Sequence, residues 1–194
     1  HGFLQVREEL GCELLDPGAS TAFAVADHQI AHVYLNDLTK LAKVKKLLEE
    51  TLGVDEVLDK KGQQKYQLNN PRSGDLVAIA AQSNWFTYYY WLKDSKAPDF
   101  ARTVDIHRKP GFDPVELFFD PSQKFLKIKL ATTLLKNQLG FRSLMEIISL
   151  DAALVKGSHG RLPQNPSVSP IFITQQSHLL SKKTIEATDV CDLI

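Results

Sequence analysis

The chain has 194 residues, 43% of them hydrophobic and 24% charged, which is enough to bury the core of one domain or of one domain with a small lobe. Basic and acidic residues both number 23, so no net charge draws the chain toward a nucleic-acid polymer or an anionic membrane. The two cysteines, Cys12 and Cys191, form no CxxC pair, and neither a disulfide framework nor a thiolate zinc site is implied.

Neither a membrane-spanning segment nor a signal peptide is visible in the sequence. No apolar run approaches the about 20 residues that cross a bilayer, and the first residues lack the basic, apolar and small-residue order of a signal peptide. We expect a soluble protein without a membrane span, in the cytoplasm or another reducing compartment. Because His1 is not preceded by an initiator methionine, we also expect a fragment or a processed product.

In chain order, the first two patterns are a helix and a hairpin. Residues 4–15 carry leucines at helical spacing, and Asp-Pro-Gly at 16–18 is a strong stop signal, so a helix is predicted there. Residues 23–26 and 30–35 are short apolar runs that a polar turn separates, which is typical of a β-hairpin.

A well-signalled helix follows over residues 38–52, where Asn36 or Asp37 can cap it and Gly53 can end it. Extended patterns come after this helix. We expect a small α+β lobe with a β-α-β-β order and a sheet of its own at residues 33–92. Its later strands are predicted at 76–80 and at 85–92, and residues 54–58 between the helix and these strands could be a further strand or a short helical turn.

The remainder begins with an irregular, ordered segment over residues 98–121, where prolines and charges are interspersed. Helical spacing returns over 122–139 and ends at Gly140. Short apolar runs predict two more strands, at 152–156 and, buried in the core, at 170–174, before a closing helical turn at Thr188-Asp189. The predicted fold class is therefore α/β, with a mixed sheet flanked by helices.

Candidate site residues must come from the histidines and neighbouring carboxylates, because Gly-rich phosphate loops, GxSxG and HExxH are absent from the sequence. The first cluster is Asp27, His28 and His32, at the predicted hairpin turn and on its second strand. All three are zinc-ligand types. The alternative is that these imidazoles hydrogen-bond the local backbone.

A second cluster consists of Asp105, His107, Arg108 and Lys109. In an extended segment, Asp105 and His107 would point the same way and could share an ion or form a carboxylate-oriented imidazole. Arg108 and Lys109 would suit a phosphoryl group. The alternative is a loop held in place by ion pairs.

The third cluster is the sharpest, and it contains His159 between Gly157-Ser158 and Gly160. Glycines let the backbone approach a ligand closely and adopt positive φ, and a preceding strand would hold the imidazole in place. This pattern favours a metal or phosphate contact, although it is also compatible with a histidine in an ordinary tight turn.

Four segments together resemble a known family, the type I phosphodiesterase/nucleotide pyrophosphatase group of the alkaline phosphatase superfamily. They are residues 23–34, 85–91, 105–117 and 157–160. The resemblance implies that residues 1–32 and 93–194 are the distal, C-terminal part of an alkaline-phosphatase-like core, with the small lobe inserted at 33–92.

The resemblance also implies a metal centre. In the family, the late Gly-x-His-Gly turn supplies an imidazole to one of two active-site metal ions, so His159 takes that role and zinc is the expected metal. The Asp27-His28 pair is similar to the family's Asp-His metal motif, but Gln29 stands where that motif has glycine. Asp105 and His107 would then lie on the substrate side.

The family's nucleophilic Thr or Ser, its early metal-binding Asp and its Asp-x-x-x-His pair all precede the similar region. We therefore expect that the missing N-terminal half or another chain completes the active site, which would hydrolyse a phosphodiester or pyrophosphate bond in a nucleotide or other phosphorylated small molecule. The aromatic residues Trp85, Phe86 and 88–90 could stack on a base or supply strand core. The alternative function is a non-catalytic binding or structural subunit.

Overall fold

The computed structural model describes residues 1–105, 107–180 and 182–193. It divides into two compact units, His1–Arg161 and Leu162–Ile194. Within the described residues, none of the helices has the length and apolar character needed to cross a membrane.

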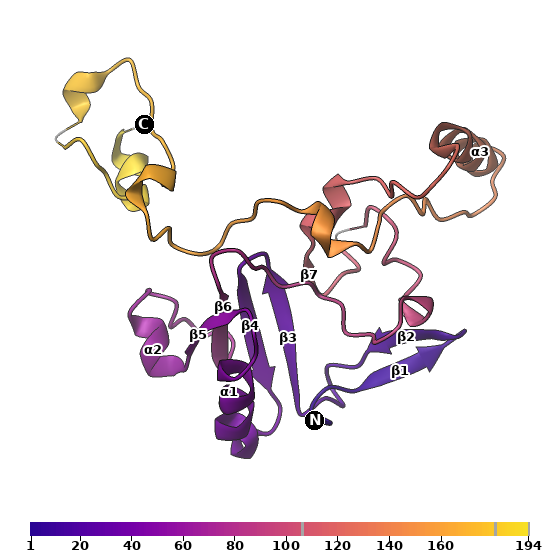
Figure 1. Ribbon diagram of the computed structural model, residues 1–194, viewed down its shortest axis with the longest axis horizontal. Coiled ribbons are helices and arrows are strands. Elements are labelled where there is room, and N and C mark those ends of the chain that lie inside the picture. Colours follow the sequence, from indigo (N-terminus) through magenta and orange to yellow (C-terminus); the bar gives the residue numbers. More distant parts are fainter. Residues whose placement is uncertain (106, 181, 194) are drawn as a thin grey trace. The chain divides into compact units, whose positions relative to one another are not determined.

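The first unit is built on a five-stranded sheet (Figure 1). The strand order is β5-β6-β4-β3-β7, and β3 and β7 run parallel while the other neighbouring pairs are antiparallel. This mixed sheet, flanked by helices, confirms the predicted α/β class. The strands are β3 (Ala22–Asp27), β4 (Ile30–Leu35), β5 (Val54–Leu58), β6 (Leu76–Ala80) and β7 (Gly111–Phe112).

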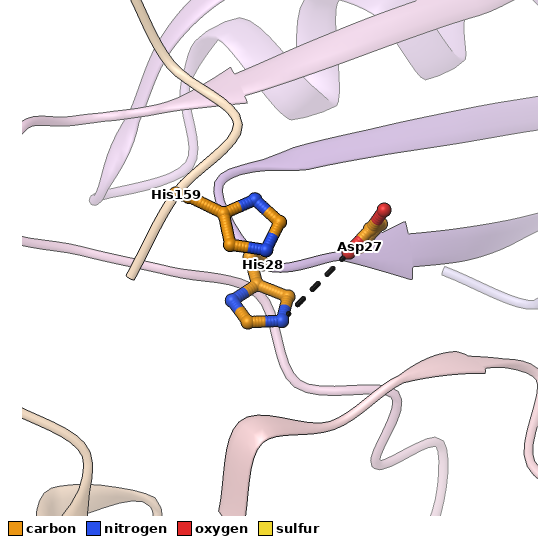
Figure 2. Close-up of side chains that lie close together, drawn as sticks. All are labelled: Asp27, His28 and His159. Carbon is orange, nitrogen blue, oxygen red and sulfur yellow. Dashed lines mark ion pairs between the residues drawn. The ribbon is translucent and has the colours of Figure 1, made fainter. Parts of the chain in front are cut away.

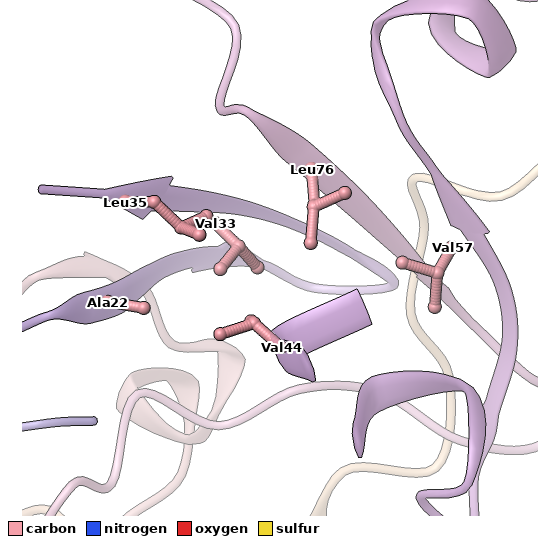
Figure 3. Close-up of a cluster of buried hydrophobic side chains, with 6 residues drawn as sticks. All are labelled: Ala22, Val33, Leu35, Val44, Val57 and Leu76. Atoms are coloured by element: carbon pink, nitrogen blue, oxygen red, sulfur yellow. The ribbon is translucent and has the colours of Figure 1, made fainter. Parts of the chain in front are cut away.

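One helix covers a face of this sheet. α1 (Leu41–Glu49) follows a single 3-10 turn at Leu38–Lys40, and the carboxylate of Asp37 caps that turn by accepting from the backbone N–H of Thr39. Val44 of α1 is buried against strand side chains, as Figure 3 shows. Gly53 adopts a positive φ of 92° beyond the helix, so the predicted helix and its stop are confirmed. The buried cluster consists of Ala22, Val33, Leu35, Val44, Val57 and Leu76.

A second, shorter helix was not predicted. α2 (Lys60–Gln64) begins where the Asp59 carboxylate accepts a hydrogen bond from the backbone N–H of Gly62. Five residues with a central glycine are too few to show a helical period, so an N-cap aspartate was its clearest signal in the sequence.

The predicted helix at residues 4–15 is wrong, because this segment is an antiparallel hairpin. Its strands are β1 (Val6–Glu9) and β2 (Cys12–Leu15). Leu10 and Gly11 form the connection, with φ values of 51° and 84°. Positive φ at both central positions is the geometry of a tight two-residue hairpin loop, and Gly11 adopts it without steric cost.

The sheet of the segment at residues 33–92 is continuous with its neighbours and not separate, contrary to the expectation from the sequence. β4 crosses the start of this segment and pairs with β3 before it and with β6 within it, so the strands of the segment share one sheet with residues outside it. The predicted strand at 85–92 is absent, since these residues are irregular. Tyr88 and Trp91 instead pack into a buried cluster with Phe100 and Leu150, so the aromatic run supplies core as expected, but from irregular chain and not from a strand.

The last part of the first unit contains α3 (Leu126–Gln138), close to the predicted helix at 122–139. The described residues of the segment 98–121 are mainly irregular, as expected, apart from β7 and a 3-10 turn at Pro114–Leu117. The predicted strand at 152–156 is wrong: Ala152–Leu154 is a 3-10 turn, and Asp151 caps it by accepting from the backbone N–H of Ala153.

The second unit contains three 3-10 segments, at Pro166–Val168, Ser177–Leu179 and Ala187–Leu193, within its described residues. The predicted core strand at 170–174 is wrong. Ile171 and Ile173 are 85% and 87% exposed, so the short apolar run that suggested a buried strand is not buried in this unit. The closing helical turn at residues 188–189 falls within the last of these segments.

Candidate metal centre

Two predicted histidine clusters meet at the end of the β3–β4 hairpin. Asp27 ends β3, His28 is the first residue of the turn, and His159 reaches the same place from a later loop (Figure 2). One ligand atom from each of these three side chains can be chosen so that all lie within 4.8 Å of one another. Among the described residues, this is the group of His, Cys, Asp and Glu side chains that could hold a metal ion.

The hairpin turn holds His28 in an unusual backbone conformation. Asp27 pairs with Ile30 across the two strands, and only His28 and Gln29 lie between them in the turn. His28 has a φ of 57°, in the left-handed region that disfavours most side chains. Glycine would fit this position without strain, so the His28 side chain is held here at a cost in backbone strain.

The loop that carries His159 is fixed to the sheet by its own backbone. The carbonyl oxygen of His159 accepts a hydrogen bond of 2.9 Å from the backbone N–H of Gln29. Gly160 follows with a φ of 110°, and a Cβ there would lie 3.4 Å from the Asp27 carbonyl oxygen. A glycine therefore lets the loop run close to the turn.

Arg161 anchors the same loop through its side chain. One guanidinium nitrogen, Nη1, lies 2.6 Å from Oδ2 of Asp55 on β5 and donates to the carbonyl oxygen of Ala80 on β6 at 2.7 Å. The arginine side chain is only 12% exposed. These contacts connect the loop to two strands on one side of the hairpin.

The other side of the hairpin is bounded by β7. Gly111 pairs with Ala26, and a Cβ on Gly111 would lie 2.2 Å from the Ala26 carbonyl oxygen, so only glycine permits this approach. The next residue, Phe112, stacks on the imidazole of His28 with ring centroids 5.3 Å apart. His28 is thus packed by both Phe112 and His159, whose ring centroid is 3.9 Å away.

The two nitrogens of His28 have different surroundings. Nδ1 lies 3.0 Å from the Ser158 hydroxyl oxygen. Nε2 is buried, has no hydrogen-bond partner, and lies 3.8 Å from Oδ1 of Asp27. If Nδ1–H donates to Ser158, Nε2 keeps its lone pair, and this arrangement of a ligating histidine with an oriented second nitrogen is common in metal sites.

The protonation state of His28 suits a ligand. Burial lowers the pKa of His28 below its ordinary value, and the nearby His159 lowers it further, while Asp27 opposes these effects by raising it. The net lowering favours the neutral imidazole, which is the form that binds a metal.

Ser158, His28 and Asp27 also follow the order of a hydroxyl–imidazole–carboxylate relay. Such a relay needs a hydrogen bond between imidazole and carboxylate, and 3.8 Å between Nε2 and Oδ1 exceeds hydrogen-bond distance. The unpartnered Nε2 therefore fits a metal better than a relay.

His32 lies apart from this centre. It sits on β4, and its Nδ1 accepts a hydrogen bond of 3.1 Å from the backbone N–H of Gly74. Burial is the main cause that lowers the pKa of His32, and Lys60 adds to it. Hydrogen bonding to the backbone, the alternative considered from sequence, describes this histidine.

The cluster at residues 105–109 also lies outside the metal-ligand group. The Arg108 N–H donates to the Asp105 carbonyl oxygen, so the segment turns here instead of extending, and Ile106 lies outside the described residues. Arg108 forms an ion pair with Asp99 at 2.9 Å. Ion pairing within a loop, the alternative interpretation, is what the structure shows for Arg108.

Lys109 is held inside the protein. Its side chain is fully buried, forms an ion pair with Glu116, and donates to the carbonyl oxygen of Thr103 at 2.9 Å. A phosphoryl group arriving from solvent could not reach this ammonium without a rearrangement.

Three residues of the site were not singled out from the sequence: Phe112, Ser158 and Arg161. Ser158 had a signal, because a hydroxyl next to a ligating histidine is a common orienting partner. Phe112 and Arg161 had none, since their contacts depend on which strands pair.

Comparison with known proteins bears on the first part of this site. A family model described as type I phosphodiesterase / nucleotide pyrophosphatase matches residues 3–113, which include Asp27 and His28 but not His159. No curated protein and no solved structure matches the chain. Because the matched residues are more than half of its length, the chain belongs to the type I phosphodiesterase/nucleotide pyrophosphatase family, within the alkaline phosphatase superfamily.

Proposed function

We propose that this chain contributes a divalent-metal site to the hydrolysis of phosphodiester or pyrophosphate bonds, with Asp27, His28 and His159 as the ligands. The observation that carries the proposal is the buried, unpartnered Nε2 of His28, next to a carboxylate and a second imidazole. A buried polar atom without a partner is costly unless something binds it.

The ligand set fits zinc. Two imidazoles and one carboxylate are ligand types that zinc prefers, and three protein ligands with a fourth position open are typical of catalytic zinc sites. His28 is buried, whereas Asp27 and His159 are exposed, so the site has a solvent-facing side. When bound, such an ion would polarise a phosphoryl oxygen and stabilise the charge that develops on it.

The surrounding residues hold the ligands. The hydroxyl oxygen of Ser158 lies 3.0 Å from Nδ1 of His28, Phe112 packs against the ring of His28, and Arg161 holds the loop of His159 against the sheet. Preorganisation of this kind matters because a misplaced ligand weakens both metal binding and catalysis.

The nucleophile belongs to a different part of the active site in this proposal. By resemblance to the family, a Thr or Ser and a second metal ion would come from residues outside 1–194, in the same protein or in another chain. The substrate would be a nucleotide or another phosphorylated small molecule, as expected for this family.

The test measures bound metal and hydrolysis in the longest native form of the protein. Wild type, His159→Ala and the control His178→Ala, whose histidine is exposed and outside the ligand group, are compared by inductively coupled plasma mass spectrometry and with a chromogenic phosphodiester. We expect His159→Ala to lose one ion and its turnover, and His178→Ala to keep both. If wild type binds metal but hydrolyses nothing, hydrolysis by this protein alone is refuted, and the non-catalytic binding function is favoured. If it binds no metal, the metal site itself is refuted.

A further inference from the structure

The outward face of α3 carries an apolar stripe. Ile128, Leu135 and Leu139 are 61%, 56% and 65% exposed. Their spacings of seven and four residues return to the same side of a helix with 3.6 residues per turn. These side chains therefore form a continuous exposed stripe, here called the α3 stripe.

The opposite face of α3 is already occupied. Leu126 and Leu130 pack against the buried cluster of Val115, Ile147 and Ile148. Thr133, on the same side, is also buried. The helix is thus docked on its own unit through one face, and the α3 stripe is a second apolar face directed away from that contact.

The charge around the α3 stripe is of one sign. No acidic residue occurs between Pro121 and Met145, a stretch with five basic residues. Lys127 and Lys136 are exposed and, by helical geometry, lie about a quarter turn to either side of the stripe. The other basic residues of the stretch are Lys124, Lys129 and Arg142.

Lysines beside an apolar stripe suit one kind of partner. Their alkyl stems can lie along an apolar phase while the ammonium groups reach anionic headgroups. Phe125 and Phe141, at the two ends of the helix, are exposed as well, and phenylalanine is a common residue on the apolar side of interfacial helices.

We propose that α3 docks on an anionic lipid surface, lying parallel to the bilayer with the α3 stripe in the headgroup region and Lys127 and Lys136 on lipid phosphates or carboxylates. A nucleic acid would be attracted by the lysines but would leave the leucines in water, so the stripe argues against it. This inference is independent of the proposed hydrolase function.

The test is co-sedimentation of the full chain with vesicles of pure phosphatidylcholine, or of phosphatidylcholine and phosphatidylserine in equal parts. We expect binding to the anionic vesicles that weakens as salt is added. The charge reversal Lys127→Glu/Lys136→Glu should reduce the partition coefficient at least about tenfold. The double substitution Ile128→Gln/Leu135→Gln, which removes apolar side chains and no charge, should reduce the partition coefficient to a similar extent.

Matched controls come from elsewhere in the first unit. Leu52→Gln and Leu92→Gln alter leucines that are almost fully exposed, and both should leave binding unchanged. Circular dichroism should show that every variant keeps the wild-type fold, since all of these side chains are exposed.

Other outcomes would overturn the proposal. Equal binding to both vesicle types, or no binding to either, would exclude an anionic bilayer as the partner. If sedimentation equilibrium shows self-association that Ile128→Gln/Leu135→Gln abolishes, a second copy of the chain covers the stripe, and the lipid proposal is wrong.

Discussion

The imidazole rings of His28 and His159 stack with their centroids 3.9 Å apart and their planes inclined by 21°. Two protonated imidazoles at this distance would repel each other, and His159 accordingly helps burial to lower the pKa of His28. A pair of neutral rings beside the Asp27 carboxylate is the state in which a cation can be shared. The relationship between these two rings depends on the loop that carries His159.

Replacement of Arg161 by alanine should loosen this loop. The change removes the contacts of one guanidinium with Asp55 and with the Ala80 carbonyl oxygen. We expect a loss of about 1–2 kcal/mol in the free energy of unfolding, because Asp55 is half exposed and its contribution is screened. Zinc affinity should fall as well. The backbone N–H of Gln29, which donates to the His159 carbonyl oxygen, should exchange its hydrogen faster.

Two controls separate positioning from a general loss of stability. Arg161→Lys keeps the charge and should recover part of the slow exchange of the Gln29 amide, measured by nuclear magnetic resonance. Arg142→Ala removes an exposed arginine and should change nothing at Gln29. Unchanged exchange at Gln29 in Arg161→Ala would show that Arg161 does not hold the loop. This measurement needs no bound metal, so it is informative even if the proposed function fails.

The sequence predicted the central hairpin, the α1 helix and β6 well, because their signals are local. Apolar runs with a polar turn, an Asp37 cap and a terminal Gly53 each act over a few residues. The hairpin at residues 6–15 was missed because leucines at helical spacing outweighed one glycine. The run at 85–92 has strand-like composition, but its aromatic side chains are buried by packing with Phe100 and Leu150, without strand pairing.

The site was predictable in its chemistry and only partly in its geometry. Asp27, His28 and His159 were candidates by residue type, and the family resemblance gave His159 its role. Local patterns could not show that His159 meets Asp27 and His28, because this depends on a loop that crosses the end of the sheet. The burial of Lys109 was not predictable either. A basic residue in a charged loop gives no sign in the sequence that it will be buried in an ion pair with Glu116.

Gly111→Ala should break the approach of β7 to β3. The added Cβ would collide with the Ala26 carbonyl oxygen at 2.2 Å, and the φ of 128° is strained for any other residue. We expect a loss of about 3 kcal/mol or more in the free energy of unfolding, measured by chemical denaturation. Gly157→Ala is the matched control, because nothing lies within 4 Å of its Cβ position. Equal, small effects of both changes would contradict the observed β3–β7 pairing.

His28→Gly and His28→Ala should differ in stability but agree in metal binding. Both remove the imidazole that packs between Phe112 and His159. Glycine alone relieves the φ of 57°, so His28→Gly should be about 1 kcal/mol more stable than His28→Ala. Thermal unfolding measures the first effect and a zinc competition assay the second. If either variant retains wild-type zinc affinity, His28 is not a ligand.

The buried pair of Lys109 and Glu116 should behave as a coupled unit. Lys109→Met removes the cation that pairs with the Glu116 carboxylate, and the Glu116 side chain is only 7% exposed. We therefore expect a loss of about 3–5 kcal/mol in the free energy of unfolding. The double variant Lys109→Met/Glu116→Leu removes both charges and should recover most of that loss. A double-mutant cycle of unfolding free energies checks this. Strict additivity of the two single changes would show that the ions do not interact.

The stability of the protein should fall in mildly acidic solution, partly through His32. Its Nδ1 must be unprotonated to accept from Gly74, and burial, with help from Lys60, lowers the pKa of His32 below the ordinary 6.5. As the pH falls through 6.5, the unfolded chain therefore takes up a proton that the folded chain does not, and the free energy of unfolding decreases until the lower, folded pKa is passed.

His32→Asn tests this origin, because the amide oxygen of asparagine can accept the Gly74 hydrogen bond in place of Nδ1 and does not titrate. Urea denaturation between neutral pH and about pH 5 should show a shallower decline for His32→Asn than for wild type, whatever its absolute stability. A decline should remain, since burial lowers the pKa of His28 in the same direction. If the free energies of unfolding of the two proteins decline in parallel with pH, the acid sensitivity does not arise from His32.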